Sequence, residues 1–260
     1  MTYAERLRQR IAESGSALCV GIDPRLDRHP SVGELSAFCE RVIGETAPYA
    51  AAFKPNIAYF EALGVPGYQL VESLIARMKE TGVPVILDAK RGDIGTTQEH
   101  YAKAYFDLWD VDAVTLSPYM GYDSVEPFLR HPGKGVYLLG VTSNPGAADL
   151  ELRDLLDGRR VFELVGDLAR RAPETPAGEG SIGLVLGLTN VSSDILERLP
   201  DVPLLIPGLG AQGGDLETLR GARRAAPSVI NVSRGILYAD EHLTFAEKAK
   251  NYADQIAQVA

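Results

Sequence analysis

The strongest constraint on the fold is a regular alternation along the chain between short apolar runs and longer segments with helical spacing. The apolar runs have the length of strands and are rich in Val, Ile and Leu, which is typical of buried strands. Eight runs follow this pattern: 17–22, 51–53, 83–87, 113–116, 135–141, 182–188, 203–206 and 229–232. Between them lie segments such as 68–79 and 161–170, where apolar residues recur every three or four positions.

This alternation predicts a parallel sheet, because helical crossovers cover the faces of such a sheet. With 260 residues, of which 45% are hydrophobic, the chain can close eight units into a single (β/α)8 TIM barrel over residues 1–260. An open doubly wound sheet is the alternative, but it usually has a glycine-rich fingerprint after the first strand, where this chain has Gly21-Ile22-Asp23-Pro24. No linker divides the chain, and we expect 173–180 to form a flexible excursion before the sixth strand.

Composition limits the partners of the chain. A formal net charge of -9 and a pI near 5.0 disfavour a nucleic-acid partner, although a small phosphorylated ligand can still bind a local positive site. Cys19 and Cys39 have no paired spacing, which fits a reducing compartment. No stretch approaches the roughly 20 apolar residues that a membrane span needs, and the first residues lack the apolar core of a signal peptide. We therefore expect a cytoplasmic protein without a membrane partner.

Charged residues gather where the predicted strands end, and catalytic groups of such barrels come from the carboxyl ends of strands. Asp88 and Lys90 are two residues apart, so on an extended strand both side chains point to one face. Lys54 ends the second run and would adjoin Asp88 on the neighbouring strand. Asp93 follows Gly92, which permits a sharp turn, so its carboxylate could rejoin this group or reach a neighbouring subunit. The sequence predicts an array of alternating charges at the barrel mouth.

A purely structural ion-pair network at one end of the barrel is the alternative interpretation, since such networks also perturb pKa values without catalysing anything. Position favours catalysis instead. Stabilising networks are expected at the amino ends of the strands, whereas these charges fall at the carboxyl ends, where holding them near one cavity costs desolvation energy.

A second group of residues predicts a phosphate site. The glycine-rich segment that begins at Pro207 and runs to 215 follows the seventh strand, and Ser233-Arg234-Gly235 follows the eighth. Loops after these two strands are the usual phosphate site of such barrels, because glycines expose backbone N–H groups and arginine can bind two oxygens. Two flexible turns with a surface arginine are the alternative.

The sequence indicates no metal or cofactor. Its histidines, His29, His100, His131 and His242, lack metal-ligand spacing, and there is no His-Glu-x-x-His or Cys-x-x-Cys motif. A Gly-x-Ser-x-Gly nucleophile elbow and a Walker loop are also missing, so acyl transfer and nucleotide hydrolysis lose support.

Several of these motifs together resemble the orotidine 5'-phosphate decarboxylase family. The segment 88–97, Asp-Ala-Lys-Arg-Gly-Asp-Ile-Gly-Thr-Thr, is similar to the signature of the family. Four further groups of motifs occur in the order of the family: Gly21-Ile22-Asp23-Pro24, Phe53-Lys54-Pro55-Asn56, Thr142-Ser143-Asn144-Pro145-Gly146, and the 207–215 segment followed by Ser233-Arg234-Gly235. The resemblance implies a cofactor-independent decarboxylase that converts orotidine 5'-monophosphate to UMP and CO2 in pyrimidine biosynthesis.

The resemblance also implies roles for individual residues at the reacting end of the substrate. Lys90 would protonate C6 as CO2 leaves, with Asp88 beside the departing carboxylate. Lys54 would hold the charge array and a ribose hydroxyl. Asp23 would bind ribose, and Ser143 would face the pyrimidine ring.

At the phosphate end, the resemblance implies binding by the segment from Pro207, with Gln212 and Arg234 on the phosphate and backbone groups around Gly213 and Gly235 assisting. Three residues of the signature are implied to cross into the site of a second subunit, which makes the protein a homodimer with shared active sites. They are Asp93, Ile94 and Thr97.

Three rival functions stay open from the residues. Sugar-phosphate decarboxylases and synthases share an Asp-x-Lys-x-x-Asp core but use a divalent metal, and the continuation Arg91-Gly92-Asp93-Ile94 favours the metal-free branch. A non-catalytic protein that binds nucleotide phosphates would have little need for the Asp88/Lys90 pair. A barrel isomerase that acts on phosphoribosyl compounds is the third possibility.

Overall fold

The computed structural model describes residues 1–171, 180–209, 216–219 and 224–258. Eight parallel strands form one sheet in the order β2-β1-β8-β7-β6-β5-β4-β3. They are β1 (Leu18–Ile22), β2 (Ala52–Pro55), β3 (Ile86–Arg91), β4 (Ala113–Leu116), β5 (Gly135–Val141), β6 (Ser181–Leu186), β7 (Leu204–Pro207) and β8 (Ser228–Val232). Parallel bridges Phe53↔Val85 and Asn56↔Asp88 join the two end strands, so the sheet closes into the predicted TIM barrel.

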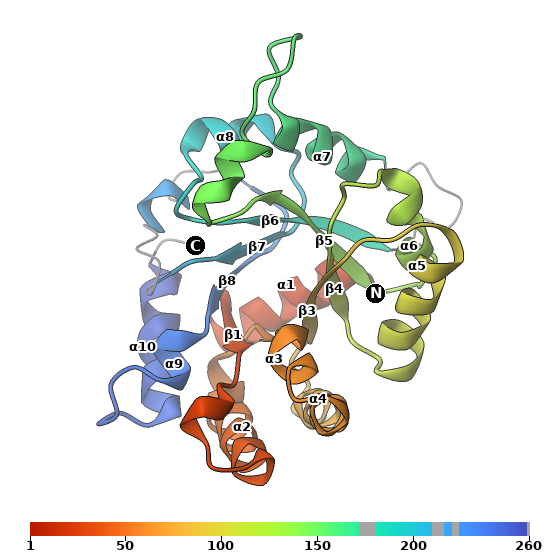
Figure 1. Ribbon diagram of the computed structural model, residues 1–260. Coiled ribbons are helices and arrows are strands. Elements are labelled where there is room, and N and C mark those ends of the chain that lie inside the picture. Colours follow the sequence, from red (N-terminus) through yellow and green to blue (C-terminus); the bar gives the residue numbers. More distant parts are fainter. Residues whose placement is uncertain (172–179, 210–215, 220–223, 259–260) are drawn as a thin grey trace.

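Helices surround the strands on the outside of the barrel, apart from α1, which lies across one end of it (Figure 1). They are α1 (Tyr3–Ser14), α2 (Val32–Thr46), α3 (Ile57–Glu61), α4 (Val65–Glu80), α5 (Gly95–Ala102), α6 (Glu126–Leu129), α7 (Val161–Arg170), α8 (Ser193–Arg198), α9 (Arg234–Leu237) and α10 (Phe245–Ala257). α5 continues as a π-helical segment, Lys103–Leu108. The apolar stripes predicted in 68–79 and 161–170 lie on α4 and α7, and they pack between the helices and the sheet.

The predicted strands match the observed ones closely except for the third. That run was expected over 83–87, whereas β3 extends over Ile86–Arg91 and therefore contains Asp88 and Lys90. Backbone pairing continues to the end of this strand, since the Ser117 N–H donates to the carbonyl of Arg91 (2.7 Å). The expected excursion at 173–180 lies almost wholly outside the described residues.

Apolar side chains fill the inside of the barrel toward the amino ends of the strands. α1 covers this end: Tyr3 and Leu7 are buried against interior residues such as Tyr137 and Ala113. The hydroxyls of Tyr3 and Tyr137 are hydrogen-bonded (3.1 Å), and the Tyr3 ring lies directly against Gly135, at the start of β5. This end is a packed core, so a ligand must enter from the carboxyl ends of the strands.

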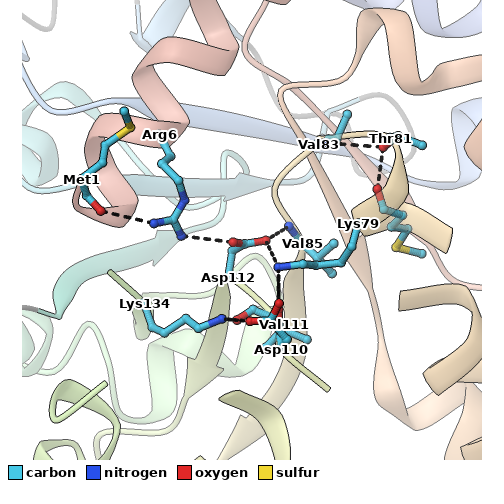
Figure 2. Close-up of polar contacts among 11 residues, drawn as sticks. Met1, Arg6, Lys79, Thr81, Val83, Val85, Asp110, Val111, Asp112 and Lys134 are labelled. Carbon is cyan, nitrogen blue, oxygen red and sulfur yellow. Dashed lines mark hydrogen bonds and ion pairs between the residues drawn. The ribbon is translucent and has the colours of Figure 1, made fainter. Parts of the chain in front are cut away.

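A network of ion pairs lies at one side of this closed end (Figure 2). The buried carboxylate of Asp112 accepts hydrogen bonds from Arg6 (3.1 Å) and from the Val85 N–H (2.9 Å). Lys79 contacts Asp110 (2.9 Å), which also pairs with Lys134. These bonds connect α1, α4 and the starts of β4 and β5, so the polar network at this end has a structural role.

Candidate active site

A cavity of about 720 Å³ opens at the carboxyl ends of the strands. Every strand of the barrel contributes to its lining, directly or through the loop that follows it. The polar lining residues are Asp23, Arg25, Lys54, Asn56, Tyr59, Asp88, Lys90, Thr115, Thr142, Ser143, Asn144, Glu151, Asn231, Ser233 and Arg234. Its size suits a mononucleotide-sized ligand, for which binding pockets commonly measure roughly 300–1,000 Å³.

The charge array expected at the barrel mouth is present. The carboxylate of Asp88 binds two ammonium groups: Oδ2 accepts from Lys54 Nζ (2.8 Å) and Oδ1 accepts from Lys90 Nζ (2.5 Å). Side-chain exposure differs sharply between the two lysines, at 5% for Lys54 and 48% for Lys90. Lys54 is therefore a buried partner of Asp88, whereas Lys90 offers its ammonium to the cavity.

The route by which Asp88 and Lys90 meet differs from the expectation. Alternation along an extended strand does not explain it, because Lys90 has a left-handed backbone (φ 47°) and the β3/β4 register shifts between Leu87 and Arg91. A bulge of this kind redirects a side chain, and a non-glycine residue with positive φ carries strain that its surroundings must hold.

Thr115 on β4 holds this strained turn. Its hydroxyl oxygen accepts hydrogen bonds from the backbone N–H groups of Ala89 (3.0 Å) and Lys90 (2.9 Å). The same hydroxyl donates to Asp88 Oδ1 (3.0 Å). Thr115 is 1% exposed, so one buried side chain fixes both the backbone of the bulge and the carboxylate that it presents.

Charge coupling keeps the array ionised. Burial alone would raise the pKa of Asp88, but the ammonium groups of Lys54 and Lys90 lower it well below the usual range of a carboxyl group. Burial would likewise lower the pKa of Lys54, yet the nearby carboxylates of Asp88 and Asp23 raise it well above that of an ordinary lysine. Near neutral pH the buried pair is a carboxylate beside an ammonium.

Three polar atoms at the ends of β1 and β8 are buried and have no hydrogen-bond partner among the described residues. They are Asp23 Oδ1, Asn231 Oδ1 and Ser233 Oγ. Gly21 allows this close packing, because a Cβ there would lie 2.7 Å from the Cβ of Ser233 and 2.9 Å from Asn231 Oδ1. Unsatisfied buried acceptors that line a cavity indicate a ligand with hydroxyl or N–H donors at this side.

The expected phosphate end of the cavity is partly described. Pro207 and Arg234 line the cavity, and within the described part of the chain no hydrogen bond or ion pair engages the guanidinium of Arg234. Gln212 and Gly213 lie outside the described residues. Gly235 does not line the cavity; a side chain there would collide with the Tyr252 ring, so its close packing against α10 explains the glycine.

The loop after β5 places Ser143 in the cavity. Next to it, the Thr142 N–H donates to Glu151 (2.7 Å), and the Asn190 side-chain amide donates to the Thr142 carbonyl (2.7 Å). Apolar side chains form the floor below, where Leu139, Val185 and Leu205 line the cavity from β5, β6 and β7.

Three residues with an implied role in a second subunit lie outside the cavity of their own chain. Asp93 accepts a hydrogen bond from the Ile94 N–H (2.8 Å), and neither residue lines the cavity. The side chain of Ile94 is 60% exposed, and Thr97 is exposed in the first turn of α5. Within one chain, Asp93 therefore does not join the Lys54, Asp88 and Lys90 array.

Sequence reasoning missed Thr115 and Asn231. Each is a lone polar residue within an otherwise apolar strand run, 113–116 or 229–232, and this was the available signal. A buried polar residue on a barrel strand needs a partner, which can be the array, as for Thr115, or a ligand.

Among the described residues, no group of three or more His, Cys, Asp or Glu side chains is arranged to hold a metal ion. In the same residues, no helix is long and apolar enough to cross a membrane. Fold and cavity together define a (β/α)8 barrel with an enzyme-like site, in which opposed charges stand at the carboxyl ends of β2 and β3.

Comparisons with known proteins narrow this class. A model of the Orotidine 5'-phosphate decarboxylase / HUMPS family matches residues 16–249. The chain is 45% identical over 274 residues to an orotidine 5'-phosphate decarboxylase of Ralstonia nicotianae, with 99% of each protein covered. It is 44% identical over 263 residues to that of Roseiflexus sp. (strain RS-1), covering 97% of this chain and 95% of the relative.

A solved structure of a putative orotidine-monophosphate decarboxylase from Toxoplasma gondii has the same fold. It superposes with a TM-score of 0.90 at 35% identity and covers 99% of this chain and 96% of its own. The chain belongs to the orotidine 5'-phosphate decarboxylase / HUMPS family.

Proposed function

We propose that this protein converts orotidine 5'-monophosphate to UMP and CO2 in pyrimidine biosynthesis, without a cofactor, and that residues 1–260 act as one domain. One observation carries the proposal: Lys90 presents a half-exposed ammonium to the cavity while Asp88 and Lys54 hold it from the buried side. The names of relatives 43–45% identical over nearly the whole chain support the substrate.

Lys90 is the proton donor in this mechanism. Breaking the bond between C6 and the carboxylate leaves the electron pair on C6 and releases CO2. The Lys90 ammonium then gives its proton to C6, and the neutral amine regains a proton from water. Since no electron sink takes the charge, stabilisation must come from a fixed positive group beside C6, which acts more strongly in a site shielded from water. Lys54 is too deeply buried for this role.

Asp88 and the apolar floor act on the leaving group. A substrate carboxylate beside Asp88 experiences repulsion between like charges, whereas neutral CO2 does not. Leu139, Val185 and Leu205 also favour the uncharged product over a carboxylate. We place this effect below the stabilisation of the carbanion by Lys90, because that stabilisation acts on the charge that develops in the transition state.

The remaining lining residues account for the nucleotide. Asp23 and Asn231 present unsatisfied acceptors that suit ribose hydroxyl donors, with Lys54 near the same side. Arg234 supplies a cation for the phosphate, together with Gln212 and backbone groups around Gly213 and Gly235. Ser143 faces the pyrimidine ring. Binding energy from the phosphate can offset the cost of orienting and desolvating the pyrimidine ring, although the phosphate lies at a distance from C6.

We further propose a homodimer that completes two shared sites. Ile94 is 60% exposed after β3, and Tyr119 and Met120 are 80% and 47% exposed after the neighbouring β4. Gly92 lies close to Ser117, so the two loops adjoin. Exposed apolar residues gathered in this way indicate a protein interface. In a dimer, Asp93, Ile94 and Thr97 of one subunit would reach the cavity of the other.

A direct assay tests the function. Purified protein is incubated with orotidine 5'-monophosphate, with and without an excess of chelator, and UMP is measured by chromatography. We expect equal rates of UMP formation in the two samples. Turnover that disappears in chelator would contradict the metal-free assignment and favour the metal-dependent sugar-phosphate branch, and no turnover in either sample would reject the substrate.

A further inference from the structure

A second pocket, of about 540 Å³, lies outside the barrel beside α2, α9 and α10. α10 packs against both of the other helices, and the three form one side of the molecule (Figure 1). None of the residues that line this pocket lines the catalytic cavity. They include three aromatic residues, Phe38, Tyr238 and Phe245, and the cations Arg28 and Lys248.

Aromatic rings form one wall of this pocket. Phe38 and Tyr238 stack with their ring centroids 5.5 Å apart and their planes at 8°, and Phe245 meets Phe38 edge to face at 5.4 Å. The His29 ring lies 4.5 Å from Phe38. A continuous aromatic wall of this kind offers both a stacking face and edges to a planar ligand.

Cations outnumber carboxylates around the same rings. Arg28, Arg41 and Lys248 line the pocket, whereas Glu241 is the acidic residue in the lining. Each cation lies over a ring of the aromatic wall, at 5.1 Å from Tyr238 for Arg28 and at 5.4 and 5.3 Å from Phe245 for Arg41 and Lys248.

The cations differ in how far their charge is neutralised. Arg41 pairs with Glu45 (3.4 Å). Within the described part of the chain, neither Arg28 nor Lys248 makes an ion pair or a side-chain hydrogen bond. Lys248 is only 6% exposed, although it lines the pocket. Its stem is packed among the helices while its Nζ stays accessible in the pocket, with no partner among the described residues, so the ammonium is free to bind an anionic group.

His29 gives an independent indication. Its Nε2 is buried and has no hydrogen-bond partner among the described residues. In contrast, the amino end of α10 is already capped, because Thr244 and Glu247 bind each other and the Phe245 N–H donates to Glu45 (3.0 Å). The unsatisfied groups are therefore side chains of the pocket and not helix amides.

We infer that this pocket is a binding site for a small molecule with an aromatic ring and an anionic group such as a phosphate monoester. The anionic group would bind Lys248 and Arg28, and the ring would lie on the wall formed by Phe38, Tyr238 and Phe245. With Arg41 paired to Glu45, the cations Arg28 and Lys248 exceed the carboxylate of Glu241 by one charge, which suits an anionic ligand. The inference is independent of the proposed decarboxylation.

The pocket has a structural connection to the catalytic cavity. The Arg25 N–H, in the loop that carries Asp23, donates to the Tyr238 hydroxyl (2.7 Å). Tyr238 directly follows α9, whose first residue is Arg234. A ligand on Tyr238 therefore touches the two segments that present Asp23 and Arg234 to the cavity.

Calorimetric titration with phenyl phosphate tests the site. The intact wild-type protein is compared with Lys248→Met, Arg28→Gln and Arg234→Ala. Lys248→Met keeps the length of a buried side chain and removes its charge, and Arg28→Gln changes an exposed residue, so at least one variant retains the fold. We expect phenyl phosphate to bind wild-type and Arg234→Ala protein, and to bind both pocket variants at least tenfold more weakly.

Three results would overturn the inference. Phenyl phosphate could fail to bind wild-type protein at millimolar concentration. Binding could disappear in Arg234→Ala and persist in Lys248→Met, which would place the ligand in the catalytic cavity. Inorganic phosphate could bind as well as phenyl phosphate, which would show that the aromatic wall contributes nothing. A wild-type midpoint of urea unfolding in Lys248→Met would show that the loss of binding is local to the pocket.

Discussion

Thr115 offers the sharpest test of how the fold positions the reacting lysine. Thr115→Val keeps the size of the side chain and removes the hydroxyl that accepts from the Ala89 and Lys90 N–H groups and donates to Asp88. No cavity is created, so the effect reports on hydrogen bonding. Ala89 is 8% exposed, and an unsatisfied buried donor costs about 1–3 kcal/mol. With the partly exposed Lys90 N–H added, we expect unfolding free energy to fall by roughly 2–4 kcal/mol.

The same substitution should impair catalysis more than binding. Without Thr115, the left-handed conformation of Lys90 loses its support, and its ammonium shifts relative to C6. A displacement near 1 Å can cost about 100-fold in rate. Affinity for UMP should change little, because Asp23, Asn231 and Arg234 lie on other strands or on the loops that follow them.

Urea unfolding gives the free energy, and steady-state kinetics with orotidine 5'-monophosphate give kcat and KM. Thr115→Ser is the matched control, since it keeps the hydroxyl and removes only the methyl group, and it should stay within about threefold of wild-type kcat. A Val variant with wild-type kcat would refute the positioning role. A Ser variant as impaired as the Val variant would show that the methyl group matters and not the hydrogen bonds.

Three further predictions concern the charge array and the dimer. Lys54→Met leaves a buried carboxylate with one ammonium partner and should lower the free energy of unfolding in urea by about 3–5 kcal/mol. The exposed control Arg77→Met should lower it by less than about 1 kcal/mol. Equal losses in the two variants would contradict the buried pairing. Folding lowers the pKa of Asp88 below its value in the unfolded chain, which is about 4. The stabilising contribution of Asp88 is therefore complete above about pH 4 and is lost as pH falls toward the folded pKa. The stability difference between wild type and Asp88→Asn should accordingly be constant from about pH 6 to 8 and shrink only in acid. A difference that shrinks near neutral pH would contradict the lowered pKa. Equal amounts of inactive Lys90→Ala and Asp93→Ala protein, dissociated and reassembled, should recover about one quarter of wild-type activity through hybrid dimers; no recovery in proven hybrids would place Asp93 in the site of its own chain.

The barrel was predictable from sequence because its signals are local. Strand-length apolar runs and helical stripes recur in order, and each reports on a few neighbouring residues. Asp88 and Lys54 were also within reach, since neighbouring parallel strands bring their carboxyl ends together.

Other features depend on contacts that sequence spacing does not encode. The left-handed conformation of Lys90 depends on Thr115 of the neighbouring strand. Alternation along an extended strand therefore predicted that Asp88 and Lys90 lie together, but it does not explain how they meet. Gly235 was expected to assist the phosphate through its backbone, and its close packing against Tyr252 is a further reason for the glycine that sequence spacing does not show. His29 and Lys248 are far apart in sequence, and the packing of α2 against α10 brings both to the lining of the second pocket.

The central claim is that Lys90 delivers the proton to C6 while other residues hold the nucleotide. Lys90→Ala tests it most directly when UMP binding by calorimetry and turnover of orotidine 5'-monophosphate are measured on the same preparation. General acid catalysis contributes about 100- to 10,000-fold, and loss of the fixed charge adds to this, so turnover should fall by at least about 1,000-fold. UMP should bind within about tenfold of wild type, because the ribose and phosphate contacts remain. Undiminished turnover in Lys90→Ala would remove Lys90 from the mechanism.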